Sequence, residues 1–149
     1  DPLARQFPLV PGGGKGFDTF EIQASVFVDI DADVQAALDR LKPREALYIG
    51  GMGHKDKNYH KDMMIRRGYA DAAERIQELY LAGAKVEAAA AVPDEWVDAR
   101  SLCGPPARIR QRYAPWEECG ATSLTVRTNQ DAAVPLMAEA ARLNPPVSG

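Results

Sequence analysis

The residues best suited to bind a ligand are Arg127, Thr128 and Asn129, which stand between an expected strand at 123–127 and an expected helix at 131–142. Main-chain N–H groups and the positive end of a helix dipole at such a position suit an anionic group. Arg127 could hold a phosphate or carboxylate through a two-pronged contact that a lysine cannot copy. In the alternative interpretation, Arg127 pairs with a carboxylate and Thr128 or Asn129 caps the helix.

Two further segments are candidates for the lining of a ligand site. Asp29 follows the other expected strand, at 21–28, together with Asp31; one of the two aspartates is expected to cap the next helix, and either could border a substrate. Gly51 and Met52 lie in a glycine-rich segment at 50–53. Glycine permits close approach to a ligand and methionine offers a soft apolar surface, although a helix stop followed by a turn explains the segment equally simply.

Other patterns that resemble functional motifs are given structural interpretations. The glycine-rich run at 12–16 precedes a strand, whereas a phosphate-binding loop follows one, so it is interpreted as a hinge. His54 and His60 do not share one helical face and lack a third strong ligand, so no metal site is expected. Cys103 and Cys119 are expected to be buried free thiols in a chain with no sign of export.

The expected elements are two strands separated by a long, mainly helical segment. The strand at 21–28 places Ile22, Ala24, Val26 and Val28 on one face, and the strand at 123–127 follows about 95 residues later. Helices are expected between them, with ends at Gly68 and Gly83, and Pro43, Pro115 and Pro135 should break, kink or shorten the helices that contain them. Residues 1–20 are interpreted as a connector, 21–143 as the folded portion and 144–149 as a tail.

The count of strands leads to a prediction about the fold. Each strand is followed by a helix, which is typical of an α/β fold with a parallel sheet. Two buried parallel strands cannot satisfy their outer edges or cover both faces, so further strands must come from elsewhere. A (β/α)8 TIM-type barrel needs about 250 residues, and the chain has 149. The sequence therefore predicts the C-terminal part of such a barrel, with two parallel strands and a helical insertion.

Several segments, taken in order, resemble the C-terminal region of the luciferase-like oxidoreductase family, and most closely its coenzyme F420-dependent branch. The resemblance runs from about Phe17 to Ala141. The segments are Arg44-Glu45-Ala46-Leu47-Tyr48-Ile49-Gly50-Gly51-Met52-Gly53, Asn58, Arg67-Gly68-Tyr69, Val92-Pro93-Asp94-Glu95, Gly104-Pro105-Pro106 and Gly120-Ala121-Thr122.

The resemblance implies a fragment or truncated form of an F420-dependent, or alternatively FMN-dependent, oxidoreductase or monooxygenase. Such enzymes transfer hydride between the cofactor and a small organic substrate, and the resemblance implies that most cofactor contacts come from parts absent from this sequence. The chain would supply the seventh and eighth strands of the barrel, and alone would be inactive. The alternative function is a non-catalytic, diverged module that self-associates or complements another barrel piece.

Composition excludes some classes of function. The formal net charge is −3, and basic residues occur only in short groups with acidic neighbours, so no nucleic-acid partner is expected. The sequence contains no apolar run of about 18 residues and begins with no recognisable signal peptide, so we expect a cytoplasmic protein that does not cross a membrane. Unsatisfied strand edges predict a homo-oligomer or pairing with a missing part of the barrel.

Overall fold

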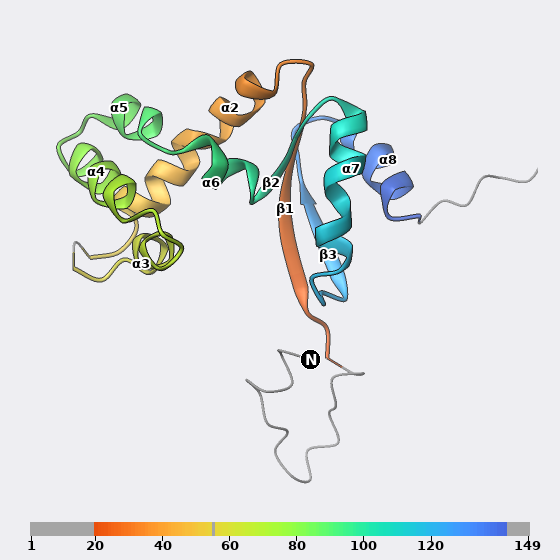
Figure 1. Cartoon of the computed structure of the whole chain (residues 1–149), viewed down its shortest axis with the longest axis horizontal. Coiled ribbons are helices and arrows are strands. Elements are labelled where there is room, and N and C mark those ends of the chain that lie inside the picture. Colours follow the sequence, from red (N-terminus) through yellow and green to blue (C-terminus); the bar gives the residue numbers. More distant parts are fainter. Residues whose placement is uncertain (1–19, 55, 143–149) are drawn as a thin grey trace, which may run out of the picture.

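The computed structural model describes residues 20–54 and 56–142, which form a small parallel sheet with helices on both sides (Figure 1). The expected connector, apart from Phe20, and the expected tail lie outside these residues. The sheet contains β1 (Gln23–Ile30), β2 (Ser101–Gly104) and β3 (Ser123–Arg127). Both β2 and β3 run parallel to β1, and the order across the sheet is β2-β1-β3.

The expectation of two strands is therefore wrong, because β2 was missed. This strand has four residues, ends in a glycine and directly precedes Pro105, and no element is assigned to it from the sequence. All four residues are buried. A segment buried on both faces lacks the alternation of apolar and polar residues by which a strand is found in a sequence. The first strand also lies two residues later than expected, because its end pairs with β2, where Ile30 lies opposite Gly104.

The order of the strands differs from that of a barrel sector. In a (β/α)8 barrel each strand lies beside the next strand in the chain, whereas here β1 lies between β2 and β3. The two connections therefore run in opposite directions across the sheet, and helices of right-handed connections then cover opposite faces. The structure confirms an α/β fold with parallel strands, but its three strands do not follow the sequential order expected of a barrel sector.

The two faces of the sheet differ in chemistry. One face carries Val26, Val28, Leu102, Leu124 and Val126, which form an apolar core with α7 (Pro106–Glu117) and α8 (Ala133–Ala140). The residues that alternate with these along each strand lie on the opposite face, which we call the polar face. They are Ser25, Phe27, Asp29, Cys103, Thr125 and Arg127. Cys103 packs into the core of the helices that lie on this side.

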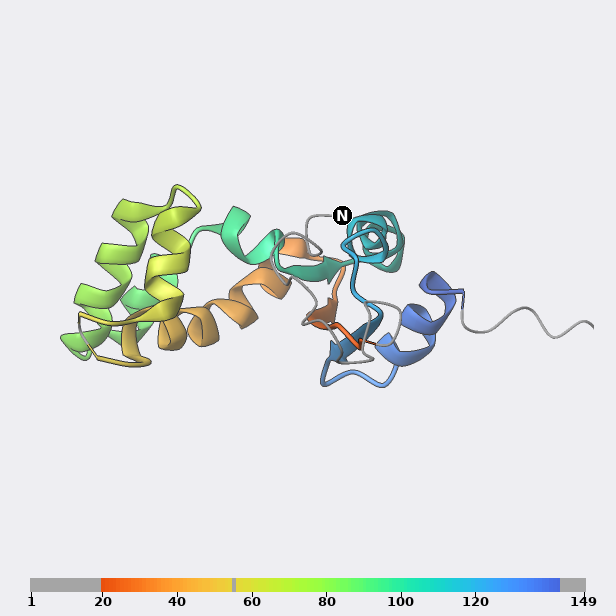
Figure 2. The same cartoon turned by 90° about the horizontal axis from the view of Figure 1, so that it is seen from below.

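Those helices occupy the segment between β1 and β2 and form a lobe of their own (Figure 2). They are α2 (Val34–Ala46), a π-helical turn (Leu47–Gly51), α3 (Tyr59–Arg66), α4 (Ala70–Leu81), α5 (Lys85–Ala90) and α6 (Asp94–Asp98). Their shared core includes Ile49, Met64, Ile76 and Trp96. Among the helices of the described residues, none combines the length and apolar character needed to cross a membrane.

Local signals fix some ends of these helices and not others. Gly68 and Gly83 have φ values of +93° and +83°, which is the left-handed conformation that ends a helix, as expected. Asp33, rather than Asp29 or Asp31, caps α2, because its side chain accepts hydrogen bonds from the Gln35 and Ala36 amides.

The prolines were expected to interrupt their helices, but α2 continues past Pro43 to Ala46, and α7 past Pro115 to Glu117. Burial of Ala37, Leu38 and Ala46 stabilises α2 despite the hydrogen bond that Pro43 cannot donate. Pro135 lies in the first turn of α8, where a missing N–H costs little.

Candidate functional site

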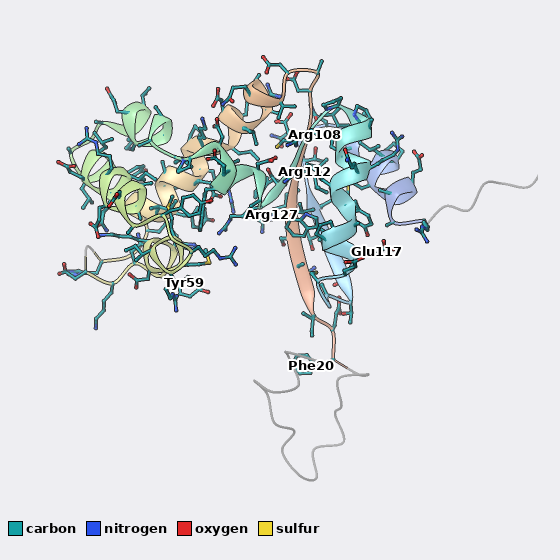
Figure 3. All side chains as sticks on the ribbon, viewed as in Figure 1. Phe20, Tyr59, Arg108, Arg112, Glu117 and Arg127 are labelled. Atoms are coloured by element: carbon teal, nitrogen blue, oxygen red, sulfur yellow. The ribbon has the colours of Figure 1, made fainter. Side chains whose placement is uncertain are left out.

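Arg127 ends β3 and projects from the polar face of the sheet toward the helical lobe (Figure 3). Its guanidinium carbon lies 5.6 Å from the centroid of the Phe27 ring, which is its register partner on β1. Within the described residues no carboxylate lies within ion-pair distance of Arg127, and the side chain is exposed. The ion pair of the alternative interpretation is therefore not formed among the described residues.

A cavity of about 440 Å³ lies between the polar face and the helical lobe. We call it the arginine pocket, because four of its lining residues are arginines from four different segments. Its lining consists of Ser25, Phe27, Arg44, Glu45, Met63, Arg67, Ala99, Arg100, Trp116 and Arg127. Although the net charge of the protein is negative, the lining of this pocket contains four guanidinium groups and a single carboxylate.

Aromatic rings hold two of these arginines in place. The guanidinium carbon of Arg44 lies 4.2 Å from the Phe27 ring centroid and 4.6 Å from that of Tyr48. Arg100 stacks in the same way on Trp96, at 4.6 Å. Cation–π contacts of this kind orient a guanidinium group without using its N–H donors. Donors of Arg44 and Arg100 are thus left to reach into the pocket.

Glu45 is the carboxylate of the pocket, and it is nearly buried. One oxygen accepts a hydrogen bond from the indole Nε1 of Trp96 at 3.0 Å and lies 3.9 Å from Arg100. The other oxygen accepts from Arg44 at 3.2 Å. Glu45 therefore connects Arg44 of α2 with Trp96 and Arg100, which precede β2. Because it holds these side chains in place, Glu45 is a positioning residue for the pocket.

His60 lies behind this cluster, with its ring 4.7 Å from the Tyr48 ring in an edge-to-face contact. Burial lowers the pKa of His60, and the nearby charge of Arg100 lowers it further. The imidazole is therefore neutral near pH 7. The positive field of the arginines thus extends to the base of α3.

Asp29, Asp31 and Thr128, which also follow the expected strands, make hydrogen bonds within the chain. The Asp29 carboxylate accepts two hydrogen bonds from Arg40, at 2.7 and 2.8 Å, and Asp31 accepts a third at 2.6 Å. Thr128 accepts from the Gln130 amide at 3.1 Å. Neither Thr128 nor Asn129 caps the following helix, because α8 begins after Ala132 without a side-chain cap.

Gln130 was missed by the sequence reasoning, although it closes the gap between the ends of β1 and β3. Its side-chain oxygen accepts from the Ile30 amide at 2.6 Å, and its side-chain nitrogen donates to the Ile30 carbonyl at 2.9 Å. The side-chain amide of Gln130 thus extends the hydrogen bonding between β1 and β3 beyond the end of β3. No sequence signal distinguishes this glutamine from a surface glutamine.

Gly51 and Met52 are not brought to the arginine pocket. Gly51 ends the π-helical turn, where a Cβ atom would lie 2.4 Å from Cε1 of Tyr80, so the glycine serves helix packing. Met52 is exposed and lines none of the cavities. The nearly buried Asn58 holds this turn, donating to the carbonyls of Tyr48 and Ile49 at 3.1 and 2.8 Å.

Arg108 and Arg112 of α7 belong to a different group, which we call the Asp98 cluster. Arg108 donates to both Asp98 oxygens, at 2.8 and 2.9 Å, and to the Cys103 carbonyl at 2.6 Å. Arg112 donates to the Asp98 carbonyl at 2.8 Å. The Gly104 carbonyl accepts from Asp31 on the β1 side, so the Cys103 carbonyl points outward, and Arg108 covers that edge of β2.

The chemistry that the described residues support is binding of an anion. Both cysteines are free; Cys103 is buried, which raises the pKa of its thiol, while Cys119 is exposed and not buried as expected. No group of three potential metal ligands occurs in residues 20–54 and 56–142. The arginine pocket can bind an anion through charge and through the paired N–H donors of its guanidinium groups.

Comparison with known proteins agrees with the expected family. The model of the luciferase-like monooxygenase family matches residues 12–123. A Mycobacterium tuberculosis protein named as a coenzyme F420-dependent oxidoreductase is 39% identical over 116 residues, which cover 78% of this chain and 33% of that protein.

Among solved structures, the coenzyme F420-dependent tetrahydromethanopterin reductase from Methanopyrus kandleri matches with a TM-score of 0.63 and 21% identity. The match covers 85% of this chain and 36% of the reductase, and at this identity it shows a shared fold. The chain therefore spans about a third of the length of the relatives that it matches.

Proposed function

This chain belongs to the luciferase-like monooxygenase family, and we propose that it forms part of an oxidoreductase that uses coenzyme F420, with FMN as the alternative. The observation that carries the proposal is Arg127, which emerges from the polar face into a pocket with three further arginines and forms no ion pair with any described residue. The proposed reaction is hydride transfer between the cofactor and a small organic substrate in the cytoplasm.

The residues around the pocket fit the anionic part of such a cofactor or substrate. Guanidinium groups stacked on rings present flat pairs of N–H donors, which match carboxylate and phosphate oxygens. A bound deazaflavin or flavin would supply the hydride chemistry. The residues of this chain would orient its anionic group: Arg127 and Arg100 by direct contact, and Glu45 by holding Arg44 and Arg100 in place.

We further propose that the chain works as the C-terminal sector of a (β/α)8 barrel. The support is the two-faced sheet, whose apolar face is covered by α7 and α8 as the outside of a barrel would be. In that assembly β1 and β3 would remain neighbours, as the seventh and eighth strands of a barrel are, and the free edge of β3 would pair with a strand from outside these 149 residues.

A non-catalytic module that self-associates is the second candidate. The observation that favours it is β3, whose residues are all half-buried or exposed, whereas those of β2 are all buried. An edge strand of this kind is a ready site for pairing with another chain. A single species with the mass of one chain, measured by light scattering at high protein concentration, would count against this candidate.

Titration of coenzyme F420 and of FMN, followed by fluorescence, tests the main proposal. The titrations use this chain and a longer chain in which the remaining strand–helix units of the family precede it. We expect the longer chain to bind F420 and the Arg127→Gln variant of that chain to bind it at least about tenfold more weakly. Arg110→Gln is the matched control, because Arg110 pairs with Glu139 on the surface and does not line the pocket. Absence of F420 and FMN binding by both chains would contradict the proposal.

A further inference from the structure

The arginine pocket has an excess of positive charge that nothing in the described residues balances. Its lining holds four guanidinium groups and the carboxylate of Glu45, which leaves a formal charge of +3. The other potential source of charge nearby, His60, is neutral near pH 7 because burial lowers its pKa. In the Asp98 cluster, by contrast, one carboxylate is shared between two arginines.

The four arginines are not equally engaged. Arg44 contacts Glu45 at 3.2 Å, and Arg100 lies 3.9 Å from the same carboxylate. For Arg67 and Arg127 the described residues provide neither an ion pair nor a side-chain hydrogen bond. Arg67 lies at the end of α3 and Arg127 at the end of β3, so two free guanidinium groups face one cavity from its two sides.

We propose that the arginine pocket binds a doubly charged phosphate group, a phosphomonoester, carried by the substrate. The inference rests on the proposed function, because that function supplies the ligand that carries the group. A dianion lowers the formal charge of the pocket from +3 to +1, whereas a monoanion leaves +2. A phosphomonoester also has three acceptor oxygens, enough for Arg127, Arg67 and Arg44 or Arg100 to donate together.

The rings of the pocket support this choice of ligand. The Arg44 and Arg127 guanidinium carbons lie 4.2 and 5.6 Å from the centroid of the same Phe27 ring. Both cations therefore border the same ring, and an anion bound in the pocket reduces the repulsion between them. The volume of about 440 Å³ leaves room for the remainder of a small ligand beside Trp116.

Calorimetric titration of this chain with phenyl phosphate and phenyl sulfate at pH 8 tests the proposal without any cofactor. The two esters share a ring and a tetrahedral group, but the phosphate is a dianion at this pH and the sulfate a monoanion. We expect phenyl phosphate to bind at least about tenfold more tightly than phenyl sulfate. Titration with FMN and riboflavin, which differ by a phosphomonoester, then shows whether a flavin can be the carrier.

Variants of the chain place the binding in the pocket. We expect Arg127→Gln to weaken phenyl phosphate binding at least about tenfold, Arg127→Lys less, and the control Arg110→Gln less than about twofold. Arg67→Gln provides a second test at an exposed position. Equal binding of the two esters, equal binding by Arg127→Gln and Arg110→Gln, or no saturable binding would overturn the inference.

This experiment separates the inference from the proposed function. Phosphate binding that depends on Arg127, together with no binding of F420 or FMN by the longer chain, would refute the proposed cofactor and keep the phosphate site. Binding of F420 by the longer chain with no preference for the phosphate ester would keep the proposed function and refute the phosphate site.

Discussion

The Asp98 cluster and the arginine pocket are two groups of arginines on either side of Trp116, and they differ in how their charges are balanced. In the Asp98 cluster, one guanidinium nitrogen of Arg108 donates to both oxygens of a carboxylate, and another donates to the backbone of β2. In the arginine pocket, four guanidinium groups surround one carboxylate. Arg44 and Arg100 approach that carboxylate, whereas Arg127 contacts the ring of Phe27 and has no ion pair within the described residues.

This difference distinguishes arginines that stabilise the fold from arginines that are available to a ligand. An arginine whose donors are satisfied by its own chain stabilises the fold, and its removal leaves buried partners unpaired. An arginine with free donors in a cavity contributes little to folding and remains available to a ligand. Substitutions in the two groups should therefore affect different measurements.

The largest effect on stability is expected from Asp98→Ala. This change leaves Arg108 and Arg112, both half-buried, without their carboxylate and opens the contact between α6 and α7. We expect the free energy of unfolding to fall by about 2–4 kcal/mol, measured by urea denaturation. Arg127→Gln serves as the opposite control and should leave the denaturation midpoint unchanged. Equal destabilisation by the two variants would break the distinction between the two groups.

A smaller effect is expected from Gly104→Ala, which tests the support of Arg108. Gly104 has a φ of +116°, and a Cβ atom there would lie 3.0 Å from Cδ of Arg108 and 3.1 Å from Cγ2 of Val34. We expect a loss of about 1–3 kcal/mol in the free energy of unfolding. Gly68→Ala is the matched control, since Gly68 has a φ of +93° but no atom within 4 Å of such a Cβ. If both variants lose the same stability, backbone strain alone accounts for the effect.

The smallest effect concerns Lys42, which lies between Asp39 and Asp94 at 2.6 Å from each. Hydrogen bonds from Lys42 hold the pKa of both carboxyl groups below the usual range. Their contribution to stability is therefore complete above the ordinary pKa and is lost as the pH falls through the lowered one. We expect Lys42→Met to raise both pKa values, as measured by NMR titration of the side-chain carboxyl carbons. Unchanged titrations would show that Gln35, which also donates to both aspartates, is sufficient.

The sequence was most informative where a residue's own conformation decides the structure. Gly68 and Gly83 end helices because glycine adopts a positive φ without steric cost. The strands at the two ends of the described region were found because their side chains alternate between an apolar and a polar face. Arg127 was singled out for its type and its place after a strand, and the structure brings it to a cavity that holds three other arginines.

Tertiary structure alone decided the rest. β2 is four buried residues whose strand conformation depends on pairing with β1, so no local periodicity marks it. Arg44, Arg67 and Arg100 are distant in sequence from Arg127 and come together only because the helical lobe folds back over the polar face. The order β2-β1-β3 is likewise set by long-range hydrogen bonds, among them those of Gln130 to Ile30. Residue types thus determined which chemical groups are available. The folding of distant segments onto one sheet determined which of these groups come together, because side chains interact through space and not along the chain.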